Sequence, residues 1–418
     1  MDAPAPAGSR LSPYHRWLFF FLGVAGFFEG YDNFAFAQVL PTLRAEMGLS
    51  RAEAGWLVGI TNIGTILAFA LVRASDTWGR RRVLTITILG YTASTLLTGL
   101  APNVWAFGAA QLLARVFLVA EWAIGTVYAA EEFPAARRGT VIGILHGLNG
   151  LGSVVCAGVA PMIVRLPLGW RGVYFVGAVP LLLMAVARRS LRETRRFTEQ
   201  VAARGDDPRP FTRILRPPHR GRMLLLALLW ALTYACINVA ITFWKEHAVG
   251  ERGMTDAAAG ANIAIAAVAA MPLAFASGKL LDLAGRRAGA VVIYGATVLG
   301  ILGAYTLDVR WMVVTSLVVG ISGITSVGVL LAAYTAELFP TDLRGDGFAW
   351  SNQLLGRVGL VLSPPLVGFA AERVGWGRAV PVTTLFPAAA LVLILVFLPE
   401  TRGRELEETS GQAGGPAS

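Results

Sequence analysis

Twelve stretches of the sequence are apolar for long enough to cross a membrane as helices, and this feature limits the possible folds more than any other. About 20 apolar residues in helical conformation cover the hydrocarbon core of a bilayer. The predicted spans are 17–40, 52–72, 83–101, 104–128, 140–163, 172–187, 222–244, 257–277, 289–307, 311–334, 346–370 and 379–398. Because 55% of the 418 residues are hydrophobic and only 15% are charged, we expect an all-α membrane protein and not a soluble enzyme.

The basic residues are distributed unevenly between the two sides of these spans. An even number of spans places both termini on one side, and most of the 36 Lys and Arg then lie on that same side. Basic loops stay in the cytoplasm, so we expect cytoplasmic termini and a multi-pass protein of the plasma membrane, for a bacterium the inner membrane. The same placement accounts for the net charge of +10 without a nucleic-acid partner.

Two loops of the first half of the chain recur in the second half. The matched pairs, each 206 residues apart, are Asp76 with Asp282, Gly79 with Gly285, Arg80 with Arg286, Arg81 with Arg287, Glu131 with Glu337, Pro134 with Pro340, Arg138 with Arg344 and Gly139 with Gly345. One offset shared by two loops predicts a duplicated unit whose copies have the same membrane orientation.

The chain is therefore predicted to contain two six-helix halves and a connector rich in Arg and Pro. The predicted boundaries are a cytoplasmic tail at 1–16, an N-terminal half at 17–187, a cytoplasmic connector at 188–221, a C-terminal half at 222–398 and a cytoplasmic tail at 399–418.

Three acids lie away from the ends of their predicted spans, where an ionised carboxylate costs about 2.5–3.5 kcal/mol or more. Glu29 and Asp32 are three residues apart and so share one helix face. Glu121 lies in the fourth span. We interpret all three as candidates for proton coupling, with Asp32 first and Glu121 as its competitor; the structural alternative is an acid that reaches water near a helix end.

Two arginines and a histidine also lie inside predicted spans. A buried guanidinium needs an anion, either a protein carboxylate or a substrate carboxylate. Arg115 could pair with Glu121 or another acid, whereas Arg357 has no acid nearby in its own span. His146 titrates near neutral pH, although packing roles are common for a single histidine. The candidates for substrate binding are Arg115, Arg357, His146, Tyr234, Asn238, Asn352 and Gln353.

The repeated loops contain Asp, Gly and Arg at fixed positions, which favours a conformational latch over a simple topology signal. Arginines at the membrane edge bind lipid headgroups and pair with acids of adjoining loops. The predicted latch residues are Asp76, Gly79, Arg80, Arg81, Gly278, Asp282, Gly285, Arg286, Arg287, Glu131, Arg138, Glu337 and Arg344.

These loops resemble the signature of the major facilitator superfamily, Gly-x-x-x-Asp-Arg-x-Gly-Arg-Arg. The second copy has Gly, Asp, Gly and both Arg at the matching positions within 278–287, whereas the first copy has Val72 and Thr77 in place of Gly and Arg. The resemblance covers the whole membrane region. It implies a twelve-helix fold with two six-helix halves that rock around a central site.

Shorter matches resemble the branch that holds sugar porters and organic-acid symporters. The segment 399–403 reads Pro-Glu-Thr-Arg-Gly, as in that branch. Glu29-Gly30-Tyr31-Asp32 is similar to the Asp-Gly-x-Asp of aromatic acid:proton symporters, with Glu for the first Asp. Glu121-Trp122 resembles the Gly-Gly-Glu-Trp of metabolite:proton and sialate or lactate:proton symporters, without the glycines.

We expect a secondary active transporter that imports a small organic anion, aromatic or another carboxylate, together with protons by alternating access. The alternatives are a proton-coupled exporter of drugs or metabolites and a sugar or polyol:proton symporter. A membrane enzyme is disfavoured because the sequence has no phosphate-binding loop and no His-Glu-x-x-His or Gly-x-Ser-x-Gly motif. A nutrient sensor is disfavoured by the short C-terminal tail.

The expected partners are a small-molecule substrate, protons and the lipid bilayer, with no nucleic acid, and the protein is expected to be monomeric. We expect no catalytic residue, no metal site and no cofactor, because the proton gradient supplies the driving force. The two cysteines, Cys156 and Cys236, lie in predicted spans and suit neither a disulfide framework nor a cysteine metal site.

Overall fold

The computed structural model describes residues 12–187, 191, 193–194, 211–340 and 343–402. Within these ranges the chain is almost entirely helical and has no strand. Most of the predicted connector at 188–221 and the outer parts of the tails at 1–16 and 399–418 lie outside the described residues.

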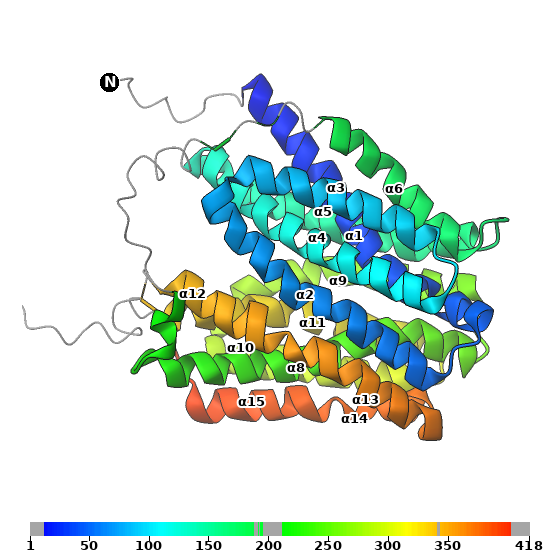
Figure 1. The fold of residues 1–418 in the computed structure, drawn as a ribbon. Coiled ribbons are helices and arrows are strands. Elements are labelled where there is room, and N and C mark those ends of the chain that lie inside the picture. The colour runs from blue at the N-terminus through cyan, green and yellow to red at the C-terminus, as the bar shows by residue number, and fades with distance from the viewer. Residues whose placement is uncertain (1–11, 188–190, 192, 195–210, 341–342, 403–418) are drawn as a thin grey trace, which may run out of the picture. The chain divides into compact units, whose positions relative to one another are not determined.

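The helices follow the predicted spans in order (Figure 1). The first six are α1 (Pro13–Met47), α2 (Arg51–Trp78), α3 (Arg80–Gly99), α4 (Val104–Glu132), α5 (Ala135–Ile163) and α6 (Trp170–Ala187). After the short η2 (Phe211–Leu215) come α8 (His219–Gly250), α9 (Asp256–Ala284), α10 (Arg286–Thr306) and α11 (Arg310–Leu338). The last two spans are series of shorter helices: α12 (Arg344–Phe348), η3 (Ala349–Gly356) and α13 (Val358–Val374), then α14 (Trp376–Val382) and α15 (Leu385–Phe397).

Among the described residues, nine helical segments are long and apolar enough to cross a membrane. The predicted class, an all-α membrane protein, is confirmed. Several helix starts have a clear local cause, because a side-chain oxygen accepts from an otherwise unpaired N–H group. Asn103 accepts from the N–H of Ala106 at 2.9 Å, and Thr255 accepts from the N–H of Ala258 at 3.2 Å.

The chain groups into two compact units. Unit 1 comprises 1–39 and 67–207, and unit 2 comprises 40–66 and 208–418. The end of α1 and the first part of α2 therefore group with the C-terminal helices. In unit 1, α3 packs along α4 and α6; in unit 2, α10 packs along α11, and α8 contacts η3, α13 and α15. The prediction of halves at 17–187 and 222–398 stays a prediction.

In unit 1, α1 and α5 cross with their backbones almost touching. A Cβ atom on Gly30 would lie 1.8 Å from the carbonyl oxygen of Asn149, and one on Gly152 would lie 1.9 Å from the carbonyl oxygen of Phe27. No larger side chain fits at either position. Small residues allow membrane helices to approach in this way.

Side chains of α5 also satisfy backbone carbonyls of α1 at this crossing. The side chain of Asn149 donates to the carbonyl of Gly26 at 3.1 Å, and the hydroxyl of Ser153 donates to the carbonyl of Gly30 at 2.9 Å. Interhelical hydrogen bonds of this kind hold helices together where no water competes. The crossing therefore fixes the part of α1 that carries Glu29 and Asp32.

Unit 2 repeats this arrangement between α8 and α13. A Cβ atom on Gly359 would lie 2.1 Å from the carbonyl oxygen of Ala231, and the hydroxyl of Ser363 donates to the carbonyl of Ala235. The crossing brings α8 against η3, a π-helical segment whose last residue precedes Arg357. Short π-helical segments occur frequently at functional sites.

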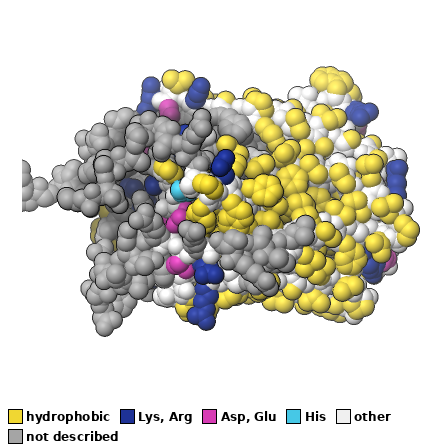
Figure 2. Space-filling view, turned by 90° about the horizontal axis from the view of Figure 1, so that it is seen from above, with side chains coloured by type: hydrophobic (Ala, Val, Ile, Leu, Met, Phe, Trp, Pro, Cys, Tyr) yellow, Lys and Arg dark blue, Asp and Glu magenta, His cyan; other side chains and the backbone are white. Residues whose placement is uncertain are grey.

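On the face in Figure 2, hydrophobic side chains form a broad patch, and Lys, Arg, Asp and Glu lie toward its edges. Large apolar side chains are exposed along many helices, for example Leu362, Leu366 and Phe369 on α13. Soluble proteins rarely expose apolar patches of this extent, whereas a lipid-facing surface requires them.

We expect Gly152→Ala to destabilise the protein, because the added Cβ forces α5 away from α1. Overpacking of this kind costs about 1–3 kcal/mol. Gly150→Ala is the matched control, since a Cβ at Gly150 meets no atom within 4 Å. Thermal unfolding of the purified protein in detergent should show a lower Tm for Gly152→Ala and an unchanged or higher Tm for Gly150→Ala. Equal Tm values would contradict the close crossing.

Candidate functional site

Asp32 lies on α1 with only 5% of its surface exposed. One carboxylate oxygen, Oδ2, accepts from the hydroxyl of Thr95 on α3 at 3.3 Å. The other, Oδ1, has no hydrogen-bond partner among the described residues. The guanidinium of Arg115 on α4 attracts Asp32 electrostatically, but the two groups form no ion pair in the described structure. Among the described residues, only one of the two Asp32 carboxylate oxygens therefore has a hydrogen-bond partner.

Arg115 donates from Nη1 to the side-chain oxygen of Asn33 and from Nη2 to the backbone carbonyl of Asn33 at 3.5 Å. Its pairing with Glu121, one of the two predicted alternatives, is not found, because Glu121 accepts no hydrogen bond from the described residues. Asn33 was not assigned from the sequence. Its signal is its position next to Asp32 inside an apolar run, where a polar side chain needs a hydrogen-bond partner.

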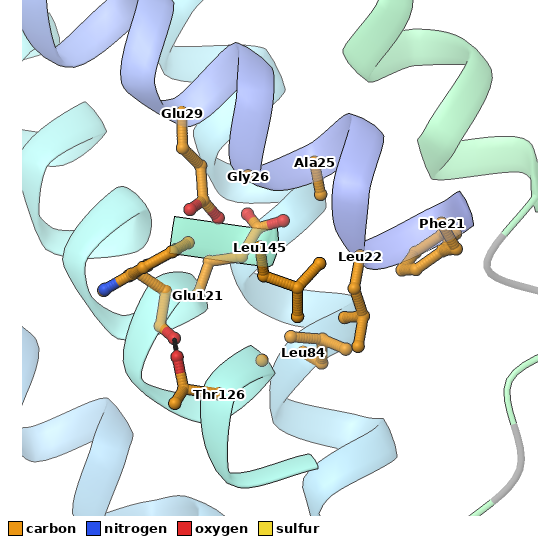
Figure 3. Close-up of a pocket in the computed structure, with 11 residues that line it drawn as sticks. Phe21, Leu22, Ala25, Gly26, Glu29, Leu84, Glu121, Thr126 and Leu145 are labelled. Atoms are coloured by element: carbon orange, nitrogen blue, oxygen red, sulfur yellow. Dashed lines mark hydrogen bonds between the residues drawn. The ribbon is translucent and has the colours of Figure 1, made fainter. Parts of the chain in front are cut away.

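Glu29 and Glu121 line one small pocket of unit 1, and Figure 3 shows their carboxyl groups extending from α1 and α4 toward the same space. Each residue is 2% exposed. Both oxygens of Glu121 and Oε2 of Glu29 lack a hydrogen-bond partner among the described residues. The rest of the pocket is mainly apolar, lined by Phe21, Leu22, Ala25, Gly26, Leu84, Trp122, Gly125, Thr126 and Leu145.

His146 of α5 is not part of the lining of this pocket. Its ring meets the ring of Trp122 edge to face, with 4.8 Å between the centroids. The side chain is otherwise exposed. The structure therefore places His146 near the two glutamates through Trp122.

Arg357 of unit 2 stands between η3 and α13. Its Nη1 donates to the backbone carbonyl of Thr65 on α2 at 2.5 Å, and the hydroxyl group of Tyr234 is an electrostatic neighbour. No ion pair involves Arg357 in the ranges that the structure describes. The half-buried positive charge of Arg357 therefore has no anionic partner among the described residues.

The uncharged candidates for substrate binding in unit 2 differ in how near they lie to Arg357. The side chain of Asn352 donates to the hydroxyl of Tyr234 at 3.0 Å, which joins η3 to α8. Asn238 donates to the backbone carbonyl of Leu360 at 3.4 Å and so helps to hold α8 against α13. Gln353 is half-buried on η3. The structure thus brings Tyr234, Asn352 and Arg357 together, with Asn238 farther along α8.

The first predicted latch forms an ion-pair cluster. Arg80 pairs with Asp76 at 2.9 Å and with Glu131 at 3.3 Å. The backbone N–H groups of Arg80 and Arg81, at the start of α3, donate to the carboxylate of Glu193 at 2.9 and 3.3 Å. The ion-pair cluster thus includes Glu193, which was not assigned from the sequence.

The second predicted latch repeats this cluster. Arg286 pairs with Glu337 at 2.8 Å and with Asp282 at 3.4 Å. The backbone N–H groups of Arg286 and Arg287, at the start of α10, donate to the carboxylate of Glu400 at 2.8 and 2.9 Å. Burial tends to raise the pKa of Glu400, but the hydrogen bonds from these two N–H groups outweigh it and hold the pKa below its usual 4.5. A negative charge at a helix N-terminus is stabilised in this way.

Both clusters need glycine immediately before the helix. Gly79 has φ 92° and Gly285 has φ 90°, values in the left-handed region that side chains disfavour. Gly278 has open space around it, so no close packing requires a glycine there. Arg138 and Arg344 form no ion pair within the described part of the chain and lie outside the clusters.

A further cluster of buried charges, at the end of α8, was missed from the sequence. Lys245 pairs with Asp256 at 2.8 Å, Glu246 pairs with Arg44, and Nδ1 of His247 lies 2.8 Å from the carboxylate of the nearby Glu251. The three side chains are at most 5% exposed. The predicted span ended at 244, whereas α8 continues to Gly250 and buries all three.

Glu251 itself repeats the helix-capping arrangement. Its carboxylate accepts from the N–H groups of Trp376 and Gly377 at 2.6 and 2.9 Å, at the start of α14, and Arg51 pairs with it at 3.1 Å. Burial opposes the effect, but the two N–H groups lower the pKa of Glu251 below 4.5. Gly375, with φ 81°, precedes α14 as Gly79 precedes α3.

Comparison with known proteins gives one family. Residues 22–364 match the model of the Major Facilitator Superfamily. The chain is 25% identical to a probable 4-methylmuconolactone transporter of Cupriavidus pinatubonensis, over 91% of this chain and 89% of that protein. It is 23% identical to the niacin transporter NiaP of Acinetobacter baylyi, over 95% of this chain and 97% of that protein.

Among solved structures, the chain resembles a D-xylose–proton symporter with a TM-score of 0.76 and 19% identity. The match covers 94% of this chain and 99% of the symporter. At this identity the likeness concerns the fold alone, and it confirms the predicted major facilitator fold.

We expect Glu337→Gln to slow substrate exchange more than Asp282→Asn does. Glu337 is a mostly buried partner of Arg286, whereas the side chain of Asp282 is 75% exposed. Losing one member of a buried pair costs several kcal/mol, and losing an exposed pair costs about 0–1 kcal/mol. Exchange rates in proteoliposomes and substrate affinity by thermal shift separate a latch from a binding role. An effect of Asp282→Asn as large as that of Glu337→Gln would contradict this ranking.

Proposed function

Because this chain belongs to the Major Facilitator Superfamily, we propose that it is a proton-coupled symporter that carries a small organic anion by alternating access. The family and the transporters among its relatives identify a multi-pass membrane transport protein and not an enzyme. The proposal adds the chemistry of the substrate, the coupling ion and the direction of coupling.

Arg357 is the observation that carries the proposal. Its guanidinium has a single described hydrogen bond, to a backbone carbonyl, and no carboxylate pairs with it in the described residues. Keeping a positive charge in this setting is costly unless an anion arrives. A planar guanidinium binds a carboxylate through two parallel hydrogen bonds, which supports a carboxylate substrate.

The groups near Arg357 suit a carboxylate that also bears an aromatic or polar ring. The hydroxyl of Tyr234 and the side chain of Asn352 already hydrogen-bond each other at 3.0 Å and can donate or accept toward a ligand. The ring of Trp230 lies beside that of Tyr234, with 5.2 Å between the centroids. Niacin, the compound named for one relative, is an aromatic carboxylic acid, which supports the same substrate class.

Asp32 is the proposed proton carrier. One of its oxygens lacks a hydrogen-bond partner in the described residues, and burial of a carboxylate in this position favours the protonated form. Arg115 and Thr95 favour the charged form. A carboxyl held between these opposing influences can change its protonation when its surroundings change during the transport cycle.

The remaining parts of the proposal concern the cell. We place the protein in the plasma membrane with both termini in the cytoplasm, as the distribution of Lys and Arg favours. It works as a monomer and uses the proton gradient without a cofactor.

We expect Arg357→Lys to weaken substrate binding by about tenfold or more, because a hydrogen bond to a charged group contributes about 1.5–3 kcal/mol and Lys cannot form the two-pronged contact. Arg373→Lys, an exposed position on α13, the helix that follows Arg357, is the control. Thermal-shift titration with aromatic and short-chain carboxylates, with sugars and cationic drugs for comparison, measures the change. Normal binding by Arg357→Lys together with loss in Arg115→Lys would move the anchor to α4.

We expect Asp32→Asn to separate substrate exchange from accumulation. Exchange of labelled for unlabelled substrate should persist, whereas uphill uptake driven by a pH gradient should fall strongly, because the amide cannot carry its proton. Asp308→Asn is the control, since the side chain of Asp308 is 93% exposed. Undiminished pH-driven accumulation in Asp32→Asn would show that Asp32 is structural and that Glu121 is the carrier.

A further inference from the structure

Among the described residues, the two carboxyl groups in the pocket between α1, α4 and α5 have no counter-charge. No ion pair involves Glu29 or Glu121 in the described residues. Other buried acids differ in this respect, since Glu131 has Arg80, Glu337 has Arg286 and Glu246 has Arg44. The two glutamates of the pocket therefore depend on something other than a cationic side chain for neutralisation.

The surrounding titratable and charged groups do not fill this role. Asp32 lies on the same helix, and Tyr91 of α3 uses its hydroxyl to donate to the backbone carbonyl of Phe28 at 3.4 Å. His146 of α5 is separated from the pocket by Trp122. Arg115 of α4 is committed to Asn33. None of these groups forms an ion pair with either glutamate in the part of the chain that the structure describes.

Two ionised carboxylates in one apolar pocket repel each other and lose their hydration, and both effects favour binding of a proton. Aspartic proteases provide a precedent in which two carboxyl groups in close proximity share one proton. The orphaned oxygens, Oε2 of Glu29 and both oxygens of Glu121, are those available to hold it.

We propose that Glu29 and Glu121 form a second proton-binding site that takes up and releases a proton independently of Asp32. In its deprotonated form, the pair holds one proton shared between two carboxyl oxygens and carries one negative charge. In its protonated form, the pair has taken one further proton from water and is neutral. No other bond forms or breaks. As part of the proposed symport, this proton accompanies the one on Asp32, so that uptake of a monoanion moves net positive charge inward.

The test is an infrared pH titration of the purified full-length protein in the Asp32→Asn background, which removes the proposed first site. Protonated buried carboxyl groups absorb separately from ionised ones. We expect a protonated-carboxyl band at neutral pH that decreases by part of its intensity as the pH rises. In Glu29→Gln and in Glu121→Gln, each isosteric, the single remaining carboxyl should lose its proton completely, so the part of the band that persists at high pH in the pair should disappear.

Two results would overturn the proposal. One is the absence of a protonated-carboxyl band that depends on Glu29 and Glu121 at neutral pH, which would mean that both are ionised. The other is such a band that stays constant through the alkaline range, which would mean a permanently neutral structural pair. The titration in the Asp32→Asn background decides between these outcomes even if a glutamine variant fails to fold, and it needs no substrate. Failure of substrate symport would leave its outcome unchanged.

Discussion

The cost of placing a charge among apolar helices is the constraint on which the rest of this structure depends. Each ionised group in the hydrocarbon core costs about 2.5–3.5 kcal/mol or more, so its partner indicates its role. Lys245 and Arg80 have carboxylates as partners and belong to the framework. Arg357 has only a backbone carbonyl, and Glu29 with Glu121 has no cation in the described residues. The groups left uncompensated are those that we assign to the substrate and to protons.

A second constraint concerns helix starts. The helices α3, α10 and α14 each follow a glycine with positive φ, and each presents two N–H groups to a carboxylate of another segment. Those carboxylates belong to Glu193, Glu400 and Glu251. A carboxylate bound in this way holds a helix end to a second segment with strong, charge-assisted hydrogen bonds. Movement of either segment must break such a bond, which makes these sites suitable as conformational latches.

Much of this was predictable from the sequence because hydropathy and repetition are local signals. The spans and the repeated loops follow from residue type and spacing alone, as does the expectation that arginines of these loops pair with acids. The specific pairs, Arg80–Glu131 and Arg286–Glu337, come from the structure. Glu193 was missed because the repeat that contains it does not share the offset of the loops. The sequence Glu-Thr-Arg at 193–195 recurs at 400–402, whereas the loops recur after 206 residues. Lys245 and its two neighbours lie beyond the end of the predicted span at 244, since only tertiary packing shows that three consecutive ionisable side chains are buried against different partners.

The central claim, that a carboxylate enters together with protons, is tested most directly by the pH change that accompanies substrate movement. Purified protein is placed in liposomes that contain a pH-sensitive dye, and a panel of aromatic and short-chain carboxylates that includes niacin is added outside without any initial gradient. We expect at least one carboxylate to acidify the liposome interior, and this acidification should be absent from protein-free liposomes. Alkalinisation of the interior, or uptake of a carboxylate without a pH change, would contradict proton symport.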